Sequence, residues 1–271
     1  MAVTKSSLPV AFSVPVQRGR RRAARWRRLA GPASLVGALL IWEAVARLSG
    51  LPAFILPPPT RVGERLLLVL ADGTLGRHAL VTLFEVLAGL GSGLIVAAVL
   101  GYIIAKSPAL ERALTPYIVA SQSVPVVAIA PLLVIWLGPG PLSKVIVCAL
   151  IVFFPILINT VVGLRSVEPE LRDLMRALNA TRWQTFTKLE VPAALPVLLG
   201  GLKIGATLAV IGAVVGEFVG SDRGLGFLVN LGRGQYDTAL VFVAVGALVA
   251  LALSLYGVVA LLEKLLLQWK R

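Results

Sequence analysis

The sequence has little of what a soluble or secreted protein needs. Only 14% of its 271 residues are charged, and it contains one cysteine, Cys148, and one histidine, His78. A single cysteine cannot form an internal disulfide, and a single histidine excludes the metal motifs that need two. No G-x-x-x-x-G-K-S/T pattern occurs, so the chain has no P-loop for ATP phosphates. We therefore expect no metal, no cofactor and no catalytic residues in this chain.

Apolar residues are abundant instead. They make up 58% of the chain, and the mean hydropathy is +0.90, whereas soluble domains are less apolar and nearly twice as charged. A helix of about 20 apolar residues spans a bilayer. Six segments fit this length approximately: 31–48, 79–105, 117–137, 142–163, 195–219 and 238–262. The sequence predicts an all-α polytopic membrane protein with about six transmembrane helices.

The first of these segments is the weakest. Glu43 and Arg47 interrupt it, although a spacing of four lets them pair on one helix face. Its basic flank, apolar core at 33–42 and small residues at 44–46 would also fit a cleaved signal peptide. Because an acidic residue stands directly before the small residues, we favour an uncleaved helix.

The net charge of +13 is concentrated at the N-terminus, where seven arginines lie within residues 18–28. A basic arm of this kind can bind nucleic acid, but no nucleic-acid-binding motif accompanies it. The positive-inside rule instead predicts a cytoplasmic tail, residues 1–30, before a transmembrane domain, residues 31–271. Six spans then place both termini in the cytoplasm.

The longest polar stretch between predicted spans is the 164–192 loop, which falls on the cytoplasmic side of this topology. Apolar residues at helical spacing within it are Leu171, Leu174, Met175 and Leu178. We expect Asn179 to end this amphipathic helix and Thr181 to cap a second helix running into Lys188. An exposed amphipathic helix followed by a turn suits a groove on another protein.

This loop resembles the signature of permease subunits of binding-protein-dependent ABC importers, which reads E-A-A, three residues, G, nine residues, I, one residue, L-P. The residues at the signature positions are Asp173, Leu174, Met175, Asn179, Leu189, Val191 and Pro192. The spacing is kept, but most identities differ. Asparagine is a plausible replacement for the glycine, since both tolerate a positive φ at a helix end.

The resemblance covers residues 57–265 and is closest to the nitrate, sulfonate and taurine branch, through LPPPTRV, VPVVAIAPLLVIWLG, FFPILINTVVGLRSVEPEL, RWQTFTKLEVPAALP and GEFVGSDRGLG. It implies the type I importer permease fold in a bacterial inner membrane. It also implies a homodimer that forms the path for a solute delivered by an extracytoplasmic binding protein. In that family the 164–192 loop docks into a separate ATPase subunit, so this chain would not itself be an enzyme.

The substrate is suggested by finer similarities. LRDLMRALNATRWQTF and GLKIGATLAVIGAVVGEFVGSDRGLGF resemble permeases for thiamine-pyrimidine precursors and riboflavin more than sulfonate permeases. The nearly charge-free helix middles also suit a neutral heterocycle. Two alternatives are the same role for a sulfonate, taurine or nitrate, and an ion-coupled secondary carrier. A carrier needs ionisable groups near the midplane, and the predicted third, fourth and sixth spans have none there.

Polar residues inside spans are candidates for the solute path because burying them in lipid is costly. These candidates are Gln122, Ser123, Asn159, Thr160 and Glu217. Each also has a structural interpretation. The 121–123 segment would begin the third span and form hydrogen bonds between helices. The 159–160 pair would satisfy a carbonyl freed by Pro155. Glu217 would anchor at the outer interface.

Overall fold

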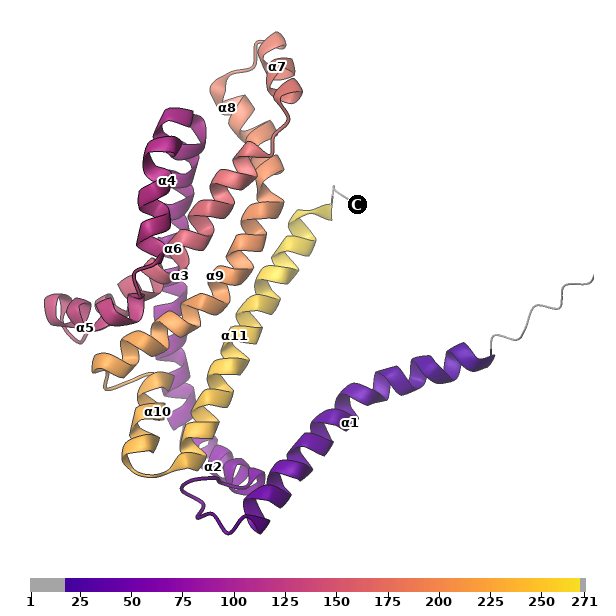
Figure 1. The fold of residues 1–271 in the computed structure, drawn as a ribbon, viewed down its shortest axis with the longest axis vertical. Coiled ribbons are helices and arrows are strands. Elements are labelled where there is room, and N and C mark those ends of the chain that lie inside the picture. The colour runs from indigo at the N-terminus through magenta and orange to yellow at the C-terminus, as the bar shows by residue number, and fades with distance from the viewer. Residues whose placement is uncertain (1–17, 269–271) are drawn as a thin grey trace, which may run out of the picture. The chain divides into compact units, whose positions relative to one another are not determined.

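The computed structural model describes residues 18–268, with side chains from residue 33 onward. Most of the predicted N-terminal tail therefore lies outside what can be described. The described chain is helical, without strands, in the order α1 (Arg18–Leu48), α2 (Pro59–Ala71), α3 (Thr74–Lys106), α4 (Pro108–Gln122), α5 (Val126–Leu137), α6 (Pro141–Arg165), α7 (Pro169–Ala177), α8 (Arg182–Thr185), the π-helical turn η1 (Phe186–Glu190), α9 (Val191–Gly220), α10 (Leu225–Gly234) and α11 (Thr238–Leu266) (Figure 1).

The chain divides into two units, residues 1–60 and residues 61–271. In the first unit, the predicted pair on α1 forms, with Arg47 Nε 2.5 Å from Glu43 Oε1. The Thr60 hydroxyl donates a hydrogen bond to the same carboxylate at 3.0 Å. Together these contacts connect the last turns of α1 to the end of the proline-rich segment that follows it.

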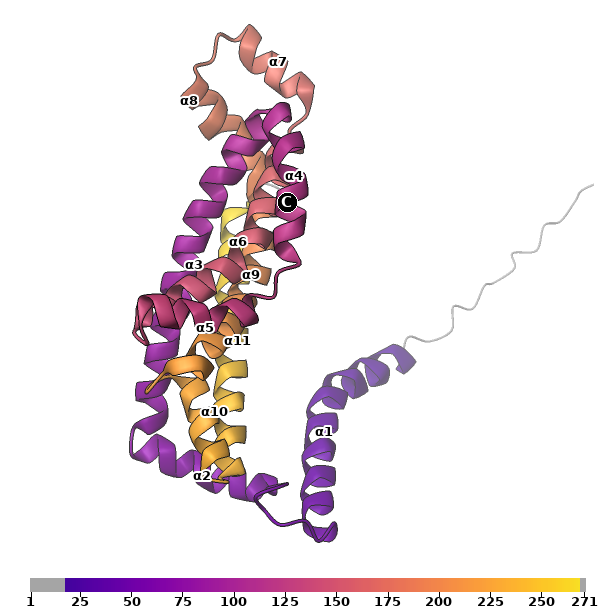
Figure 2. The ribbon, with the colours of Figure 1, turned by 60° about the vertical axis from the view of Figure 1, so that its left-hand side comes forward.

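The second unit is a bundle in which α6 packs between α3 and α9 (Figure 2). Glycines allow the close approach of these helices. A Cβ on Gly89 would lie 2.9 Å from the carbonyl oxygen of Val145, and one on Gly212 would lie 2.8 Å from Cα of Cys148. Cys148 is fully buried between these two glycines. Gly89 and Gly212 thus allow α3 and α9 to pack closely against α6.

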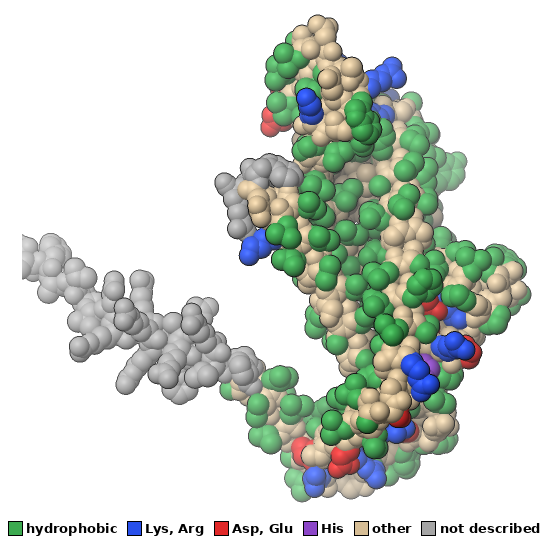
Figure 3. All heavy atoms as spheres, turned by 180° about the vertical axis from the view of Figure 1, so that it is seen from behind, with side chains coloured by type: hydrophobic (Ala, Val, Ile, Leu, Met, Phe, Trp, Pro, Cys, Tyr) green, Lys and Arg blue, Asp and Glu red, His purple; other side chains and the backbone are tan. Residues whose placement is uncertain are grey.

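Large hydrophobic side chains remain on the outside of this bundle. Leu80, Ile95 and Leu253 each expose about two thirds of their surface. Figure 3 shows hydrophobic side chains over the flank, whereas most of the visible charged side chains lie toward the ends. Such a surface is unfavourable in water and suits contact with lipid.

Four helices of the described chain are long and apolar enough to cross a membrane, or five if one bent pair counts as a single span. The four are α3, α6, the continuous stretch 182–220, and α11. They match the predicted spans at 79–105, 142–163, 195–219 and 238–262. The fold class is confirmed, and the count of about six spans is not confirmed by the described residues.

The third predicted span, 117–137, is wrong as a continuous helix. It is the bent pair: α4 ends at Gln122, α5 begins at Val126, and the two helices meet at 88°. Pro125 lacks the amide proton that a continuing helix needs and disfavours helical backbone at Val124. Ser123 consequently caps the C-terminal end of α4 rather than opening a span.

Candidate functional site

The first candidate site is the helix–turn–helix element formed by α7 and α8 at one end of the bundle (Figure 1). Pro169 occupies the first position of α7, where its missing amide proton costs nothing. The helix ends where Asn179 adopts φ +50°. The Asn179 amide donates to the Arg176 carbonyl and the Ala180 amide to the Met175 carbonyl, each at 3.0 Å. This is a Schellman turn, and it confirms the expected helix end with positive φ at residue 179.

The second helix begins as predicted. Thr181 Oγ1 accepts a hydrogen bond from the Gln184 amide at 3.2 Å, and Gln184 Oε1 accepts one from the Thr181 amide at 2.8 Å. This reciprocal pair is a capping box. The second helix does not stop at Lys188, however, because α8, η1 and α9 form one 39-residue stretch. The signature positions Leu189 to Pro192 therefore lie within a continuous helix.

The apolar residues of α7 and its C-terminal cap, Leu178, do not all face inward. The exposed fractions of Leu171, Leu174 and Leu178 are 40%, 53% and 67%. Beside them, Asp173 and Arg176 form an exposed ion pair at 2.8 Å. An exposed apolar strip with flanking charges, at the end of a membrane bundle, is the kind of surface that another protein covers.

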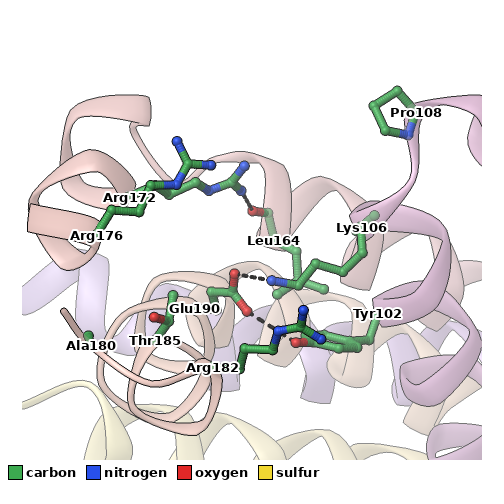
Figure 4. A pocket seen from close by; sticks show the side chains of 11 residues that line it. Tyr102, Lys106, Pro108, Leu164, Arg172, Arg176, Ala180, Arg182, Thr185 and Glu190 are labelled. Carbon is green, nitrogen blue, oxygen red and sulfur yellow. Dashed lines mark hydrogen bonds and ion pairs between the residues drawn. The ribbon is translucent and has the colours of Figure 1, made fainter.

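Contacts with α3 and α6 hold this element in place (Figure 4). The Glu190 carboxylate is only 3% exposed; it pairs with Lys106 and accepts a hydrogen bond from the Tyr102 hydroxyl at 3.4 Å. Arg172 Nη2 donates to the Leu164 carbonyl at 2.7 Å. Sequence reasoning missed Glu190 and Lys106, because their pairing joins segments 84 residues apart.

The candidate path residues at the bend and on α6 bond mainly to their own helices. Gln122 is exposed, and its side chain donates to the Ile118 carbonyl at 3.4 Å. Asn159 donates to the Pro155 carbonyl and Thr160 to the Ile156 carbonyl, each at 2.7 Å. The expectation that this pair satisfies the carbonyl freed by Pro155 is wrong, since that carbonyl lies four residues before the proline.

Glu217, the remaining path candidate, lies in a buried polar cluster near the opposite end of the bundle. It is 1% exposed and accepts hydrogen bonds from the Thr82 hydroxyl at 2.6 Å and from the Gly226 amide. The Leu225 amide in turn donates to the Thr82 oxygen at 2.8 Å. Glu85 is equally buried beside Glu217. Instead of anchoring at an interface, Glu217 fastens the start of α10.

Comparison with known proteins identifies the family. Residues 93–268 match the family described as binding-protein-dependent transport system inner membrane component. The chain belongs to this family. It is therefore the permease subunit of an ABC importer, a multi-pass inner-membrane component, and this replaces the alternative of an ion-coupled carrier.

Several named relatives cover most of the permease. The riboflavin transport system permease protein RibX of Chloroflexus aurantiacus is 47% identical over 98% of this chain and 99% of its own length. The formylaminopyrimidine transport permease protein ThiX of Halalkalibacterium halodurans is 37% identical over 86% and 92%. The taurine transport system permease protein TauC of Escherichia coli is 33% identical over 84% and 85%.

The fold of the permease also has a solved counterpart. A chain of the inward-facing MetNI methionine ABC transporter superposes with a TM-score of 0.63 at 19% identity, covering 72% of this chain and 97% of that chain. This likeness confirms the importer permease fold.

Proposed function

We propose that the permease carries a heterocyclic vitamin or vitamin precursor, riboflavin or a thiamine pyrimidine, delivered by an extracytoplasmic binding protein. The observation that carries this proposal is the 47% identity to a riboflavin permease along nearly the whole chain. The 37% identity to ThiX supports the same chemical class. Transport of taurine or another sulfonate is the second candidate, supported by the 33% identity to TauC.

Energy for transport would come from a separate ATPase that α7 and the following turn engage. The exposed apolar strip on α7 supports this role, and so does the Schellman turn that holds α7 against the start of the next helix. The residues proposed for this docking are Asp173, Leu174, Met175, Asn179, Leu189, Val191 and Pro192. Asp173 supplies a charge at the rim, where electrostatic complementarity sets orientation and rate of association.

Two copies of the permease would form the path. One bundle with four or five spans is too small to surround a vitamin-sized solute, and a two-fold axis supplies the second wall with the same sequence. The side chains proposed to line the path are Gln122, Ser123 and Asn159, because the other two candidates, Thr160 and Glu217, are buried and bonded inside the bundle. Both termini and the 164–192 loop would face the cytoplasm.

The substrate is tested in proteoliposomes that contain the permease, its ATPase and its binding protein. We expect ATP-dependent uptake of labelled riboflavin or a thiamine pyrimidine, with no competition from excess taurine. Uptake of taurine alone would replace the proposal by its alternative. ATP-independent uptake driven by an ion gradient would contradict the coupling scheme.

The orientation is tested separately by thiol labelling. In a Cys148→Ser background, a cysteine at position 176 lies on the exposed face of α7. We expect a membrane-impermeant maleimide to label it in inverted vesicles but not in intact cells. Labelling only in intact cells would overturn the proposed topology. A cysteine at position 223, in the loop before α10, is the matched control and should give the opposite result.

A further inference from the structure

A basic cavity of about 670 Å³ lies behind the α7–α8 element (Figure 4). Its charged lining comes from two distant parts of the chain. The residues are Lys106 on α3, Arg172 and Arg176 on α7, Arg182 on α8 and Glu190 on η1. Four cations thus line one cavity with a single carboxylate, and clustered charge of one sign attracts counter-ions.

The ion pairs within the described chain leave two of these cations without a carboxylate. Glu190 pairs with Lys106, and Asp173 pairs with Arg176. Arg172 bonds through Nη2 to a backbone carbonyl, and its Nε is buried without a hydrogen-bond partner. Arg182 is exposed and makes no ion pair with any described residue. Arg172, with one buried nitrogen that has no partner, and Arg182, with no ion pair, thus line the same cavity. Guanidinium groups of this kind suit a phosphate, which arginine recognises through paired hydrogen bonds.

A second cavity adjoins the first, and its chemistry is different. It measures about 750 Å³ and shares Tyr102, Leu164 and Arg182 with the basic cavity. The rest of its lining is almost entirely apolar and includes Val99, Ile103, Trp183, Phe186 and Leu198. Trp183 is 70% exposed at this edge, and tryptophan favours the boundary between lipid headgroups and acyl chains.

We propose that these joined cavities bind an anionic phospholipid, with the phosphate in the basic cavity that Arg172 and Arg182 line and an acyl chain along the apolar groove. A basic site alone would suit any soluble phosphate, but continuity with an apolar groove along α3, a helix long and apolar enough to cross a membrane, selects a lipid. The bound lipid would connect the α7–α8 element to α3. Only the assignment of the lipid to the cytoplasmic leaflet rests on the proposed function.

The test measures lipid retained by the purified full-length permease in detergent, by native mass spectrometry. The permease is incubated with equal amounts of dioleoylphosphatidylglycerol and dioleoylphosphatidylcholine. We expect selective retention of the phosphatidylglycerol. Removal of one arginine charge, in Arg182→Gln or Arg172→Gln, should lower that retention about fivefold, the effect of one basic residue on an anionic lipid. Lys188→Gln is the matched control: Lys188 is exposed on η1, outside the lining of both cavities, and its loss should change nothing.

Arg182→Gln is the decisive variant, because Arg172 also bonds the Leu164 carbonyl and its loss can disturb the loop. Equal retention of the two lipids, or unchanged retention by Arg182→Gln, would overturn the proposal. Displacement of phosphatidylglycerol by an equal concentration of inorganic phosphate would also overturn it, by showing a site for soluble anions. The measurement needs no ATPase, binding protein or substrate, so its failure is separate from a failure of the proposed transport function.

Discussion

The left-handed conformation of Asn179 allows a prediction with a definite magnitude. At φ +50° the residue lets two amides, its own and that of Ala180, bond back to the last turn of α7. Replacing Asn179 with valine keeps a similar size but adds a branched Cβ, which clashes with the backbone in this region. Replacing it with glycine removes the Cβ altogether.

The cost of the valine substitution follows from this geometry. A left-handed conformation costs an ordinary L-residue about 1–2 kcal/mol, and a β-branched residue lies at the upper end of that range. About 2 kcal/mol corresponds to a population of the closed turn lowered roughly 30-fold. Asn179→Gly relieves strain but gains chain entropy when the turn opens, by about 0.4–1 kcal/mol. These two effects nearly cancel, so the glycine variant should resemble the wild type.

Hydrogen exchange of the turn measures this effect directly. In Asn179→Val the Ala180 amide should exchange roughly 30-fold faster than in the wild type, and Asn179→Gly should stay within a few fold. Amides of α3 serve as the internal control for an intact bundle. We also expect the valine variant to lose co-purification with the ATPase and substrate-stimulated ATP hydrolysis. Wild-type exchange at Ala180 in the valine variant would refute the strain argument. Wild-type ATP hydrolysis despite faster exchange would mean that the turn is not the coupling element.

Three further predictions concern helix packing, the buried cluster and the rim of α7. Gly89→Ala should lower the melting temperature in detergent, because overpacking costs about 1–3 kcal/mol. Gly91→Ala is the control and should not lower it, since a Cβ at Gly91 has no neighbour within 4 Å. Equal melting temperatures for the two variants would contradict the packing. Thr82→Val should destabilise the fold by about 1–3 kcal/mol, because it removes a hydrogen bond to buried Glu217; an unchanged melting temperature would argue against that bond. Asp173→Lys should leave the melting temperature unchanged, since the exposed ion pair of Asp173 with Arg176 contributes little to stability. The same variant should weaken co-purification of the ATPase. Undiminished co-purification would show that Asp173 is not part of the docking surface.

The sequence was sufficient wherever a feature depends on neighbouring residues. Apolar run length predicted the membrane class and four of the spans. The positive φ of Asn179 and the capping box of Thr181 follow from side-chain chemistry within a few residues of each helix end. These elements are confirmed because local backbone preferences need no knowledge of the rest of the chain.

The break in the third predicted span depends partly on neighbouring residues and partly on tertiary packing. Pro125 and the residues before it signal a helix end, but the apolar run on both sides reads as one continuous span. The 88° angle between α4 and α5 depends on how α5 packs against α6 and α9. A hydropathy pattern counts apolar residues and carries no direction, so it could not supply that angle.

Only the tertiary structure joined residues far apart in the chain. Glu217 reads from sequence as a carboxylate near a helix end, yet the loop after α9 folds back and buries it against Thr82, 135 residues away. The basic cavity likewise forms because Lys106 and Arg182 reach the same space from different helices. Burial and electrostatic partners are set by the packing of α3, α6 and α9, because a side chain's environment is a sum over spatial neighbours that the linear order of residues does not specify.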